Sequence, residues 1–291
     1  MNKTTLLKAM LLERKALPCP GVYDSLSARM AEKCGFKAVQ ISGFGFSAAS
    51  LGMTDASFTS LEEVVRATAN IVRAVSIPVM ADADTGYGNA VNVWWTTKRL
   101  EETGAAGMNL EDQCLPKRCG HMEGKQLISL EEMVGKVRAA VDAKRDKDFV
   151  INARTDACAV YGIDEAIRRA NAYLEAGADM IFLESPATIE DMKRGLAEIR
   201  GPVSINMLEG GKTPRLTFSE LAEMGVARVS CPMFASLVTA CALEKGYSYL
   251  MEHGSSVGFE EYMTFADFKS FTDTDLVRAM EKKYISDVMK S

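Results

Sequence analysis

The sequence predicts an α/β fold of the (β/α)8 TIM barrel class, and three observations favour this fold. Eight short apolar segments recur along the chain, and each is typical of a buried parallel strand because it is too short for a helix. Amphipathic helical patterns lie between these segments. Four of the joints from helix to strand share a glycine where a helix end favours a positive φ: Gly35, Gly104, Gly177 and Gly225. A doubly wound sheet is the alternative, but it does not predict eight such units.

The predicted elements follow one another along the chain. Strands are expected at 21–24, 38–42, 78–84, 107–111, 149–154, 180–184, 203–206 and 228–231. Helices are expected at 4–15, 60–75, 90–103, 129–144, 164–176 and 189–199. Capping residues are expected at Thr59 or Ser60, at Ser129, and at Thr217 or Ser219, because Glu follows each within a helical turn.

The chain is predicted to form one domain, 1–291, in which 255–291 is a helical C-terminal extension. A helix at 234–252 follows the eighth strand, and 259–290 adds more helix with regularly spaced apolar residues. A monomeric barrel has no obvious place for this tail. We therefore expect it to cover a barrel end or to pack on another subunit.

Composition limits the class of function. A net charge of -5 argues against nucleic acid or an anionic membrane as the partner, because both require a basic face. We expect a small-molecule substrate and a cytoplasmic protein, since no apolar run approaches the ~20 residues of a membrane span and no secretory leader is recognisable. The seven cysteines lack a zinc-ligand pattern and are interpreted as reduced thiols, mostly in the core.

The ends of the predicted strands carry the chemistry. In this fold they meet at one face of the barrel, where several carboxylates would repel one another unless a cation neutralised them. Oxygen ligands without a nearby histidine favour Mg²⁺, or Mn²⁺, over Zn²⁺. The alternative is that one Asp only caps the next helix. The strand-end residues are Asp24, Ser42, Asp82, Asp84, Glu111, Arg154, Glu184 and Asn206.

Arg154 ends a buried strand, so it requires an anion, either Glu184 or a substrate carboxylate. The polar loop 206–214 is a candidate for holding a second carboxylate. With only two histidines, no Ser-His-Asp triad can be argued, and the second of them, His253, is interpreted as a helix C-terminal cap.

The loop 113–128 contains the densest group of reactive side chains. Lys117, Arg118, Cys119 and His121 fall within five positions, and the cations would lower the pKa of the thiol. A single cysteine among seven is more often a packing residue, and that alternative stays open for Cys119.

Six segments of the sequence form a recognisable set. They are Ser-Gly-Phe-Gly at 42–45, Asp-Ala-Asp-Thr-Gly-Tyr-Gly at 82–88, Glu-Asp-Gln at 111–113, Lys-Arg-Cys-Gly-His at 117–121, Ala-Arg-Thr-Asp at 153–156, and 206–214. In order and spacing over nearly the whole chain, they resemble the isocitrate lyase and phosphoenolpyruvate mutase superfamily, and most of all its branch of 2,3-dimethylmalate and 2-methylisocitrate lyases. The segment at 117–121 is specific, because the lyases carry it and the phosphonate mutases have an Asn-containing loop there.

The resemblance implies a barrel whose eighth helix is exchanged between subunits, in a dimer or a dimer of such dimers. It implies Mg²⁺ bound by Asp82 directly, and by Asp55, Asp84 and Glu111 through water. Substrate would contact Ser42, Gly43, Phe44, Arg154, Glu184 and Asn206. Cys119 would be the catalytic acid/base, supported by Lys117, Arg118, His121 and Glu111, on a loop that closes over the site.

The implied reaction is cleavage of the C2–C3 bond of a 2-hydroxy dicarboxylic acid to a 2-oxo acid, such as pyruvate, and a carboxylic acid. Gln40 replaces the Tyr of the methylisocitrate lyases, and 262–268 resembles the dimethylmalate branch, which favours a smaller, malate-type acid. The alternatives are oxaloacetate hydrolysis, carboxyvinyl-phosphonate chemistry, and a barrel without catalytic activity that binds carboxylic acids.

Overall fold

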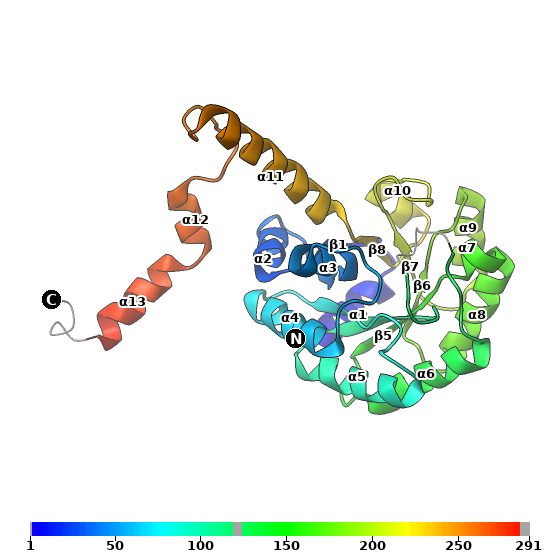
Figure 1. Cartoon of the computed structure of the whole chain (residues 1–291). Coiled ribbons are helices and arrows are strands. Elements are labelled where there is room, and N and C mark those ends of the chain that lie inside the picture. Colours follow the sequence, from blue (N-terminus) through cyan, green and yellow to red (C-terminus); the bar gives the residue numbers. More distant parts are fainter. Residues whose placement is uncertain (1, 119–123, 286–291) are drawn as a thin grey trace. The chain divides into compact units, whose positions relative to one another are not determined.

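The computed structural model describes residues 2–118 and 124–285 and contains a closed barrel of eight parallel strands (Figure 1). The strands follow sequence order around the barrel, and β1 pairs with β8 to close it. This confirms the predicted (β/α)8 fold. The strands are β1 (Leu17–Val22), β2 (Val39–Ile41), β3 (Val79–Asp82), β4 (Gly107–Glu111), β5 (Val150–Thr155), β6 (Met180–Leu183), β7 (Val203–Asn206) and β8 (Arg228–Cys231).

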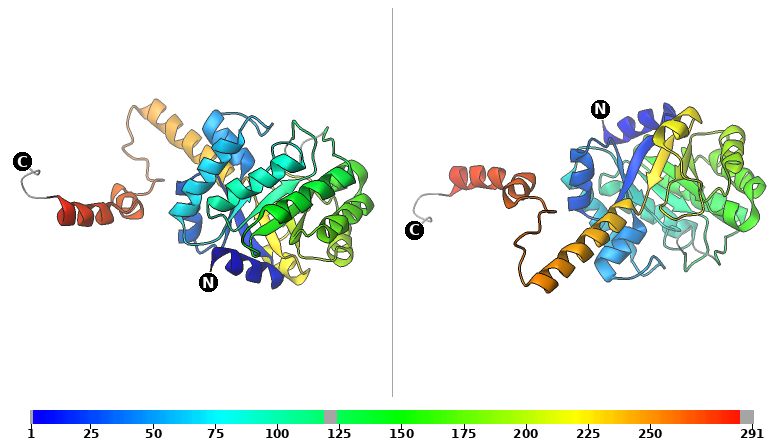
Figure 2. Two further views of the ribbon diagram at one scale, coloured as in Figure 1. Left: turned by 90° about the horizontal axis from the view of Figure 1, so that it is seen from below. Right: turned by 90° about the horizontal axis from the view of Figure 1, so that it is seen from above.

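Helices enclose the strands, as both views in Figure 2 show. Several of them turn an apolar stripe inward. In α4 (Leu61–Ala74) the buried residues include Val64, Thr68 and Ile71, which share one face of the helix. The helices of the barrel are α1 (Lys3–Leu12), α2 (Ser25–Lys33), α3 (Gly43–Leu51), α4 (Leu61–Ala74), α5 (Ala90–Glu102), α6 (Leu130–Ala143), α7 (Ala157–Tyr161), α8 (Ile163–Glu175), α9 (Ile189–Glu198) and α10 (Phe218–Glu223).

The predicted N-caps and C-terminal glycines of these helices are confirmed. Ser60, Ser129 and Thr217 are the N-caps, and each side chain accepts a hydrogen bond from the backbone N–H three residues later. The four joint glycines have φ values of +95°, +84°, +104° and +82° in chain order, which side chains with a Cβ rarely adopt.

The N-terminal helix α1 lies against the amino-terminal part of the barrel. Its Leu7 and Leu11 are buried in a cluster with Leu17, Met80 and Met180. Thr4 also donates a hydrogen bond to Asp146, and Lys8 pairs with Asp179 near the start of β6. This end is therefore filled by packing, which leaves the carboxyl ends of the strands for the chemistry.

Two strands differ from the prediction by more than one residue at a boundary. The first strand begins at Leu17 rather than at residue 21. Its two prolines are tolerated because residues 17–20 pair with β8 while only residues 21–22 pair with β2. The third strand ends at Asp82 rather than at residue 84, because Asp84 takes a left-handed conformation with φ +46°.

The prediction that the cysteines lie mostly in the core is wrong. Cys19 is buried in the barrel, but Cys34 and Cys241 are exposed, and Cys114, Cys158 and Cys231 are half-buried. Cys34 occupies the C-cap of α2, so its place is fixed by a helix end rather than by apolar packing.

The chain divides into two compact units, residues 1–238 and 239–291. The helix after β8, α11 (Phe234–His253), begins at the end of the first unit, while the predicted extension starts at 255. The further helix predicted within 259–290 is present as α12 (Phe265–Phe271) and α13 (Thr274–Tyr284), which are separated at Asp273 with φ +58°. His253 Nδ1 lies 3.1 Å from the Tyr249 carbonyl oxygen, as expected for a residue at a helix C-terminus.

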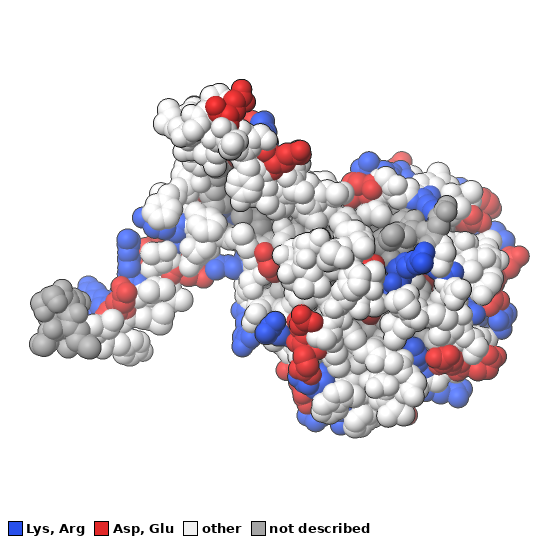
Figure 3. All heavy atoms as spheres, viewed as in Figure 1, with Lys and Arg blue, Asp and Glu red and all other residues white. Residues whose placement is uncertain are grey.

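The surface fits the acidic composition. On the barrel face shown in Figure 3, Lys and Arg side chains are interspersed with Asp and Glu. A basic stripe of the kind that binds nucleic acid is not visible on that face. Within residues 2–118 and 124–285, no helix is both long and apolar enough to cross a membrane.

Candidate active site

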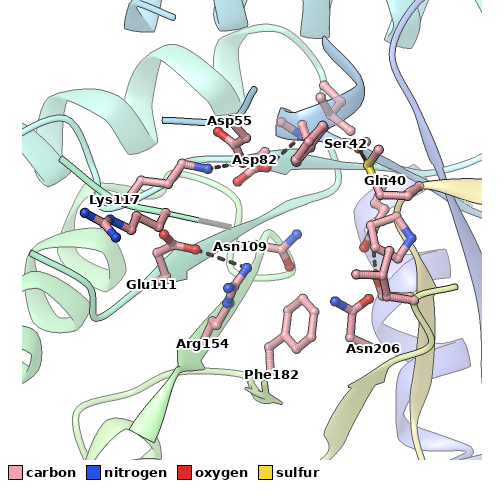
Figure 4. Close-up of a pocket in the computed structure, with 18 residues that line it drawn as sticks. Gln40, Ser42, Asp55, Asp82, Asn109, Glu111, Lys117, Arg154, Phe182 and Asn206 are labelled. Atoms are coloured by element: carbon pink, nitrogen blue, oxygen red, sulfur yellow. Dashed lines mark hydrogen bonds and ion pairs between the residues drawn. The ribbon is translucent and has the colours of Figure 1, made fainter. Parts of the chain in front are cut away.

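A cavity of ≈ 60 Å³ lies at the carboxyl ends of the strands. Figure 4 shows its side chains converging from different strands, with Asp82 and Lys117 on one side and Arg154 and Asn206 on another. Its described lining residues are Gln40, Ile41, Ser42, Gly43, Phe44, Asp55, Asp82, Asn109, Glu111, Lys117, Arg118, Arg154, Phe182, Asn206, Leu208, Ser230, Pro232 and Met233.

One wall of the cavity is built where β2 turns into α3. Ser42 is the N-cap of α3, and its Oγ accepts a hydrogen bond from the Gly45 N–H. The Gly43 N–H in turn donates to Asp82 Oδ2 at 3.0 Å. A Cβ at Gly43 would lie 2.6 Å from that oxygen, so only glycine lets the α3 backbone approach the carboxylate so closely.

Lys117 joins this wall to the loop that follows β4. Its backbone N–H donates to Ser57 Oγ, and its buried Nζ lies 2.5 Å from Asp55 Oδ2 and 2.8 Å from Asp84 Oδ1. Burial alone would lower the pKa of Lys117, but Asp84, Glu111 and Asp55 hold it well above its ordinary value. Lys117 is therefore a fixed cation among carboxylates.

Arg154 is the second cation of the cavity. Its Nη1 lies 3.1 Å from Glu111 Oε2, its Nε and Nη2 contact both oxygens of Asp156, and its Nε lies 3.6 Å from Glu184 Oε2. Burial opposes the charged form, but the three carboxylates hold the pKa of Arg154 well above its usual range. The anion required at this strand end is thus supplied in part by the protein.

The carboxylates exceed these cations in number. The cavity region contains four carboxyl groups and three cations, namely Asp55, Asp82, Asp84 and Glu111, and Lys117, Arg118 and Arg154. Burial and the charge of Asp84 raise the pKa of Asp82 to about 6, and burial raises the pKa of Glu111 well above its usual range. Burial is the largest cause of both shifts, and at Glu111 the charges of Arg154 and Lys117 oppose it.

These residues fit a hard divalent cation. The donors are carboxylate oxygens, and Glu111 Oε1 is buried without a hydrogen-bond partner among the described residues. Within the described ranges, however, no three Asp, Glu, His or Cys side chains are grouped closely enough to hold a metal directly. Mg²⁺ commonly keeps several water ligands in proteins and is bound by only one or two carboxylates.

Most of the predicted site residues are brought together. Ser42, Gly43, Phe44, Asp55, Asp82, Glu111, Lys117, Arg118, Arg154 and Asn206 line the cavity. Asp84 and Glu184 lie behind the lining, where Asp84 contacts Lys117 and Glu184 contacts Arg154. Cys119 and His121 fall outside the described residues.

Asp24 does not belong to the site, although it also follows a strand. Its carboxylate accepts a hydrogen bond from the Ser27 N–H and caps α2. The interpretation that a strand-end Asp only caps the next helix thus applies to Asp24 rather than to Asp82.

The hydrogen-bonded polar residues at the base of the cavity were not predicted as site residues. Gln40 Nε2 donates to Ser230 Oγ at 2.5 Å, and Arg228, fully buried, donates to Asn109 Oδ1. The Phe182 ring lies 5.5 Å from the guanidinium of Arg154 and 5.3 Å from that of Arg228. The available signal was a polar residue inside an otherwise apolar strand, since such a residue must find a buried partner.

Comparison with known proteins agrees with this geometry. The family model described as phosphoenolpyruvate phosphomutase matches residues 7–250. The 2,3-dimethylmalate lyase of Eubacterium barkeri is 42% identical over 285 residues, covering 98% of this chain and 99% of that protein.

Two solved structures extend the comparison. One is a 2,3-dimethylmalate lyase, described as a PEP mutase/isocitrate lyase superfamily member, with a TM-score of 0.92 and 33% identity over 98% of this chain and 96% of that one. The other is oxaloacetate acetylhydrolase with the inhibitor 3,3-difluorooxalacetate, with a TM-score of 0.89 and 34% identity over 96% and 95% of the two chains. The chain therefore belongs to the phosphoenolpyruvate phosphomutase family, within the PEP mutase/isocitrate lyase superfamily.

Proposed function

We propose that this chain is a magnesium-dependent carbon–carbon lyase that cleaves a 2-hydroxy dicarboxylic acid of the 2,3-dimethylmalate type. The products would be a 2-oxo acid, pyruvate for dimethylmalate, and a carboxylic acid, propionate. The observation that carries the proposal is the cavity in which an excess of carboxylates, Asp82 and Glu111 among them, faces Arg154 and Lys117. The similarity to 2,3-dimethylmalate lyase supports the same reaction.

The family resemblance implies the roles of the residues, and their charges fit those roles. Asp82 would hold Mg²⁺ directly, with Asp55, Asp84 and Glu111 acting through water. When bound, the ion would supply Lewis acidity that lowers the pKa of the substrate hydroxyl. Arg154 would bind the C1 carboxylate and the 2-oxygen, because its guanidinium faces the cavity and is held in place by Asp156.

The bond changes balance without another reactant. A base removes the proton of the 2-hydroxyl, the C2–C3 bond breaks, and its electron pair stays on C3 of the departing acid. We propose that the Cys119 thiol then protonates that carbon, while Lys117 and Arg118 stabilise the negative charge that develops.

The walls of the cavity favour a small substrate. The cavity has a volume of ≈ 60 Å³, and its apolar surface comes from Phe44, Phe182, Leu208, Pro232 and Met233. Lys117, Arg118 and Arg154 already have roles with a dicarboxylate, so a third carboxylate, as in methylisocitrate, would need another cation. Short alkyl groups on a malate skeleton suit this surface better.

A panel of acids tests the proposal. Purified protein with Mg²⁺ is incubated with 2,3-dimethylmalate, other 2-alkylmalates, methylisocitrate and oxaloacetate, and the products are followed by NMR. We expect a 2-oxo acid from a 2-alkylmalate and its disappearance with EDTA. Acetate and oxalate from oxaloacetate, with no alkylmalate cleaved, would establish the hydrolase instead.

The substitution Cys119→Ala is expected to lower kcat by on the order of 10² to 10⁴, the usual contribution of a general acid. Binding of the dianion oxalate should persist, because Arg154 and the carboxylates remain. Cys34→Ala is the control, since Cys34 is exposed at a helix end and its loss should leave kcat unchanged. A Cys119→Ala protein with full activity would assign the proton transfer to another group.

We also propose a homo-oligomer in which α11 is exchanged between subunits, either a dimer or a dimer of such dimers. The support is the surface of α11, α12 and α13, where no described residue is buried in the single chain. Large exposed apolar residues there include Tyr247, Phe265 and Tyr284. Sedimentation should give the mass of a dimer or tetramer, and a monomer at micromolar concentration would refute this.

A further inference from the structure

Lys125 and Arg154 contact the same carboxylate, that of Asp156. Lys125 Nζ lies 2.8 Å from Asp156 Oδ1, and both side chains are almost completely buried. The same Asp156 oxygen also accepts a hydrogen bond from Arg154 Nη2 at 3.0 Å. One carboxylate therefore joins Lys125 to the guanidinium that faces the cavity.

Asp156 has little freedom to move. Its backbone N–H donates to Asp112 Oδ1 at 3.0 Å, and the fully buried Asp112 also accepts hydrogen bonds from Thr155 and Tyr173. The backbone at Asp156 is thus held in place by the fold, while its carboxylate contacts Lys125 and Arg154. What remains variable is how its charge is divided between Lys125 and Arg154.

The charge around Arg154 shows why this division matters. Three carboxylates, Glu111, Asp156 and Glu184, contact one guanidinium. The three negative charges around it would repel an anionic substrate more strongly than the single guanidinium attracts it. Lys125 supplies a second buried positive charge to the same group.

We propose that Lys125 is a positioning residue that keeps Arg154 available to an anionic ligand by sharing the charge of Asp156. Lys125 is not among the described residues that line the cavity, so it acts through Asp156 and Arg154. The inference rests on the proposed role of Arg154 as the carboxylate-binding residue of the lyase.

Oxalate binding in the presence of Mg²⁺ tests this without turnover. Isothermal titration of the full-length protein should show Lys125→Met binding oxalate more weakly by on the order of 10- to 100-fold, the usual cost of removing a partner that orients a ligand-binding residue. Lys125→Arg should recover most of the affinity. In an Asp156→Asn background the effect of Lys125→Met should shrink, because the proposed coupling passes through Asp156.

Lys144→Met is the matched control. Lys144 Nζ also lies 2.9 Å from a carboxylate, that of Asp179, and Lys8 is a second cation in contact with Asp179. This group lies by the starts of β5 and β6, away from the cavity. The Lys144→Met substitution should lower the unfolding temperature about as much as Lys125→Met and leave oxalate affinity unchanged. If the two variants lose affinity equally, the role of Lys125 is only structural.

Two further results would overturn the inference. One is wild-type affinity in Lys125→Met, and the other is a wild-type protein that binds no oxalate, since Arg154 would then hold no anion. Failure of the lyase proposal alone would give another result. In that case oxalate binds and responds to Lys125, but none of the acids in the panel is cleaved.

Discussion

Asp82→Asn is expected to lower kcat/KM by on the order of 10³-fold, because a divalent ion contributes several kcal/mol to a transition state and each 1.4 kcal/mol is about tenfold in rate. An amide keeps the shape of the side chain and can still accept the Gly43 N–H hydrogen bond, so the α3 wall should remain in place. Steady-state kinetics with saturating Mg²⁺ measures the loss.

The control for this variant is Asp24→Asn. Asp24 also follows a strand and accepts a backbone N–H, but it caps α2 and does not line the cavity. Its replacement should change kcat/KM by less than about twofold, as for most sites remote from the chemistry. Equal losses in the two variants would show that Asp82 has no particular role.

The same account predicts how Mg²⁺ affinity depends on pH. The pKa of Asp82 without metal is raised to about 6 by burial and by the charge of Asp84. Protons therefore compete with Mg²⁺ as the pH falls through this value, and Mg²⁺ affinity should fall with it. In Asp82→Asn this component of the pH dependence should be absent.

The second large effect is expected from Arg154→Lys, which should lower kcat/KM by on the order of 10²- to 10³-fold, comparable with removing a key electrostatic donor. The charge is kept, but an ammonium group cannot contact Glu111 and both oxygens of Asp156 while it also binds substrate. KM should rise as well as kcat fall.

Arg168→Lys provides the comparison for this change. Arg168 also binds a carboxylate through two nitrogens, with Glu165 at 2.6 and 2.8 Å, but the pair is exposed on α8. Its replacement should leave kinetics unchanged. Normal activity in Arg154→Lys would mean that a single charge suffices and that the fork of the guanidinium is not used.

The barrel could be predicted because its signals are local and repeated. An apolar strand segment, a capped amphipathic helix and a glycine such as Gly104 or Gly177 each leave a mark within a few residues. Asp82, Glu111 and Arg154 could be placed at one face because strand ends converge in this fold. The start of β1 was missed because Pro18 argues against a strand, although its pairing with β8 tolerates it.

The contacts between side chains from different loops and strand ends could not be predicted. That Lys117 lies against Asp55 and Asp84, or that Asp156 joins Lys125 to Arg154, depends on loop paths across the barrel mouth. Asp24 and Asp82 look alike in sequence, and only the hydrogen bonds of each distinguish a helix cap from a site residue. Spacing along one strand carries no information about the residue opposite.

Crystals grown with Mn²⁺ and oxalate, measured at a wavelength where manganese scatters anomalously, test the central claim most directly. The account predicts one anomalous peak within bonding distance of the Asp82 carboxylate, with oxalate contacting Arg154 on the other side of the ion. Oxalate bound at Arg154 with no peak at Asp82, or a peak elsewhere in the protein, would contradict it.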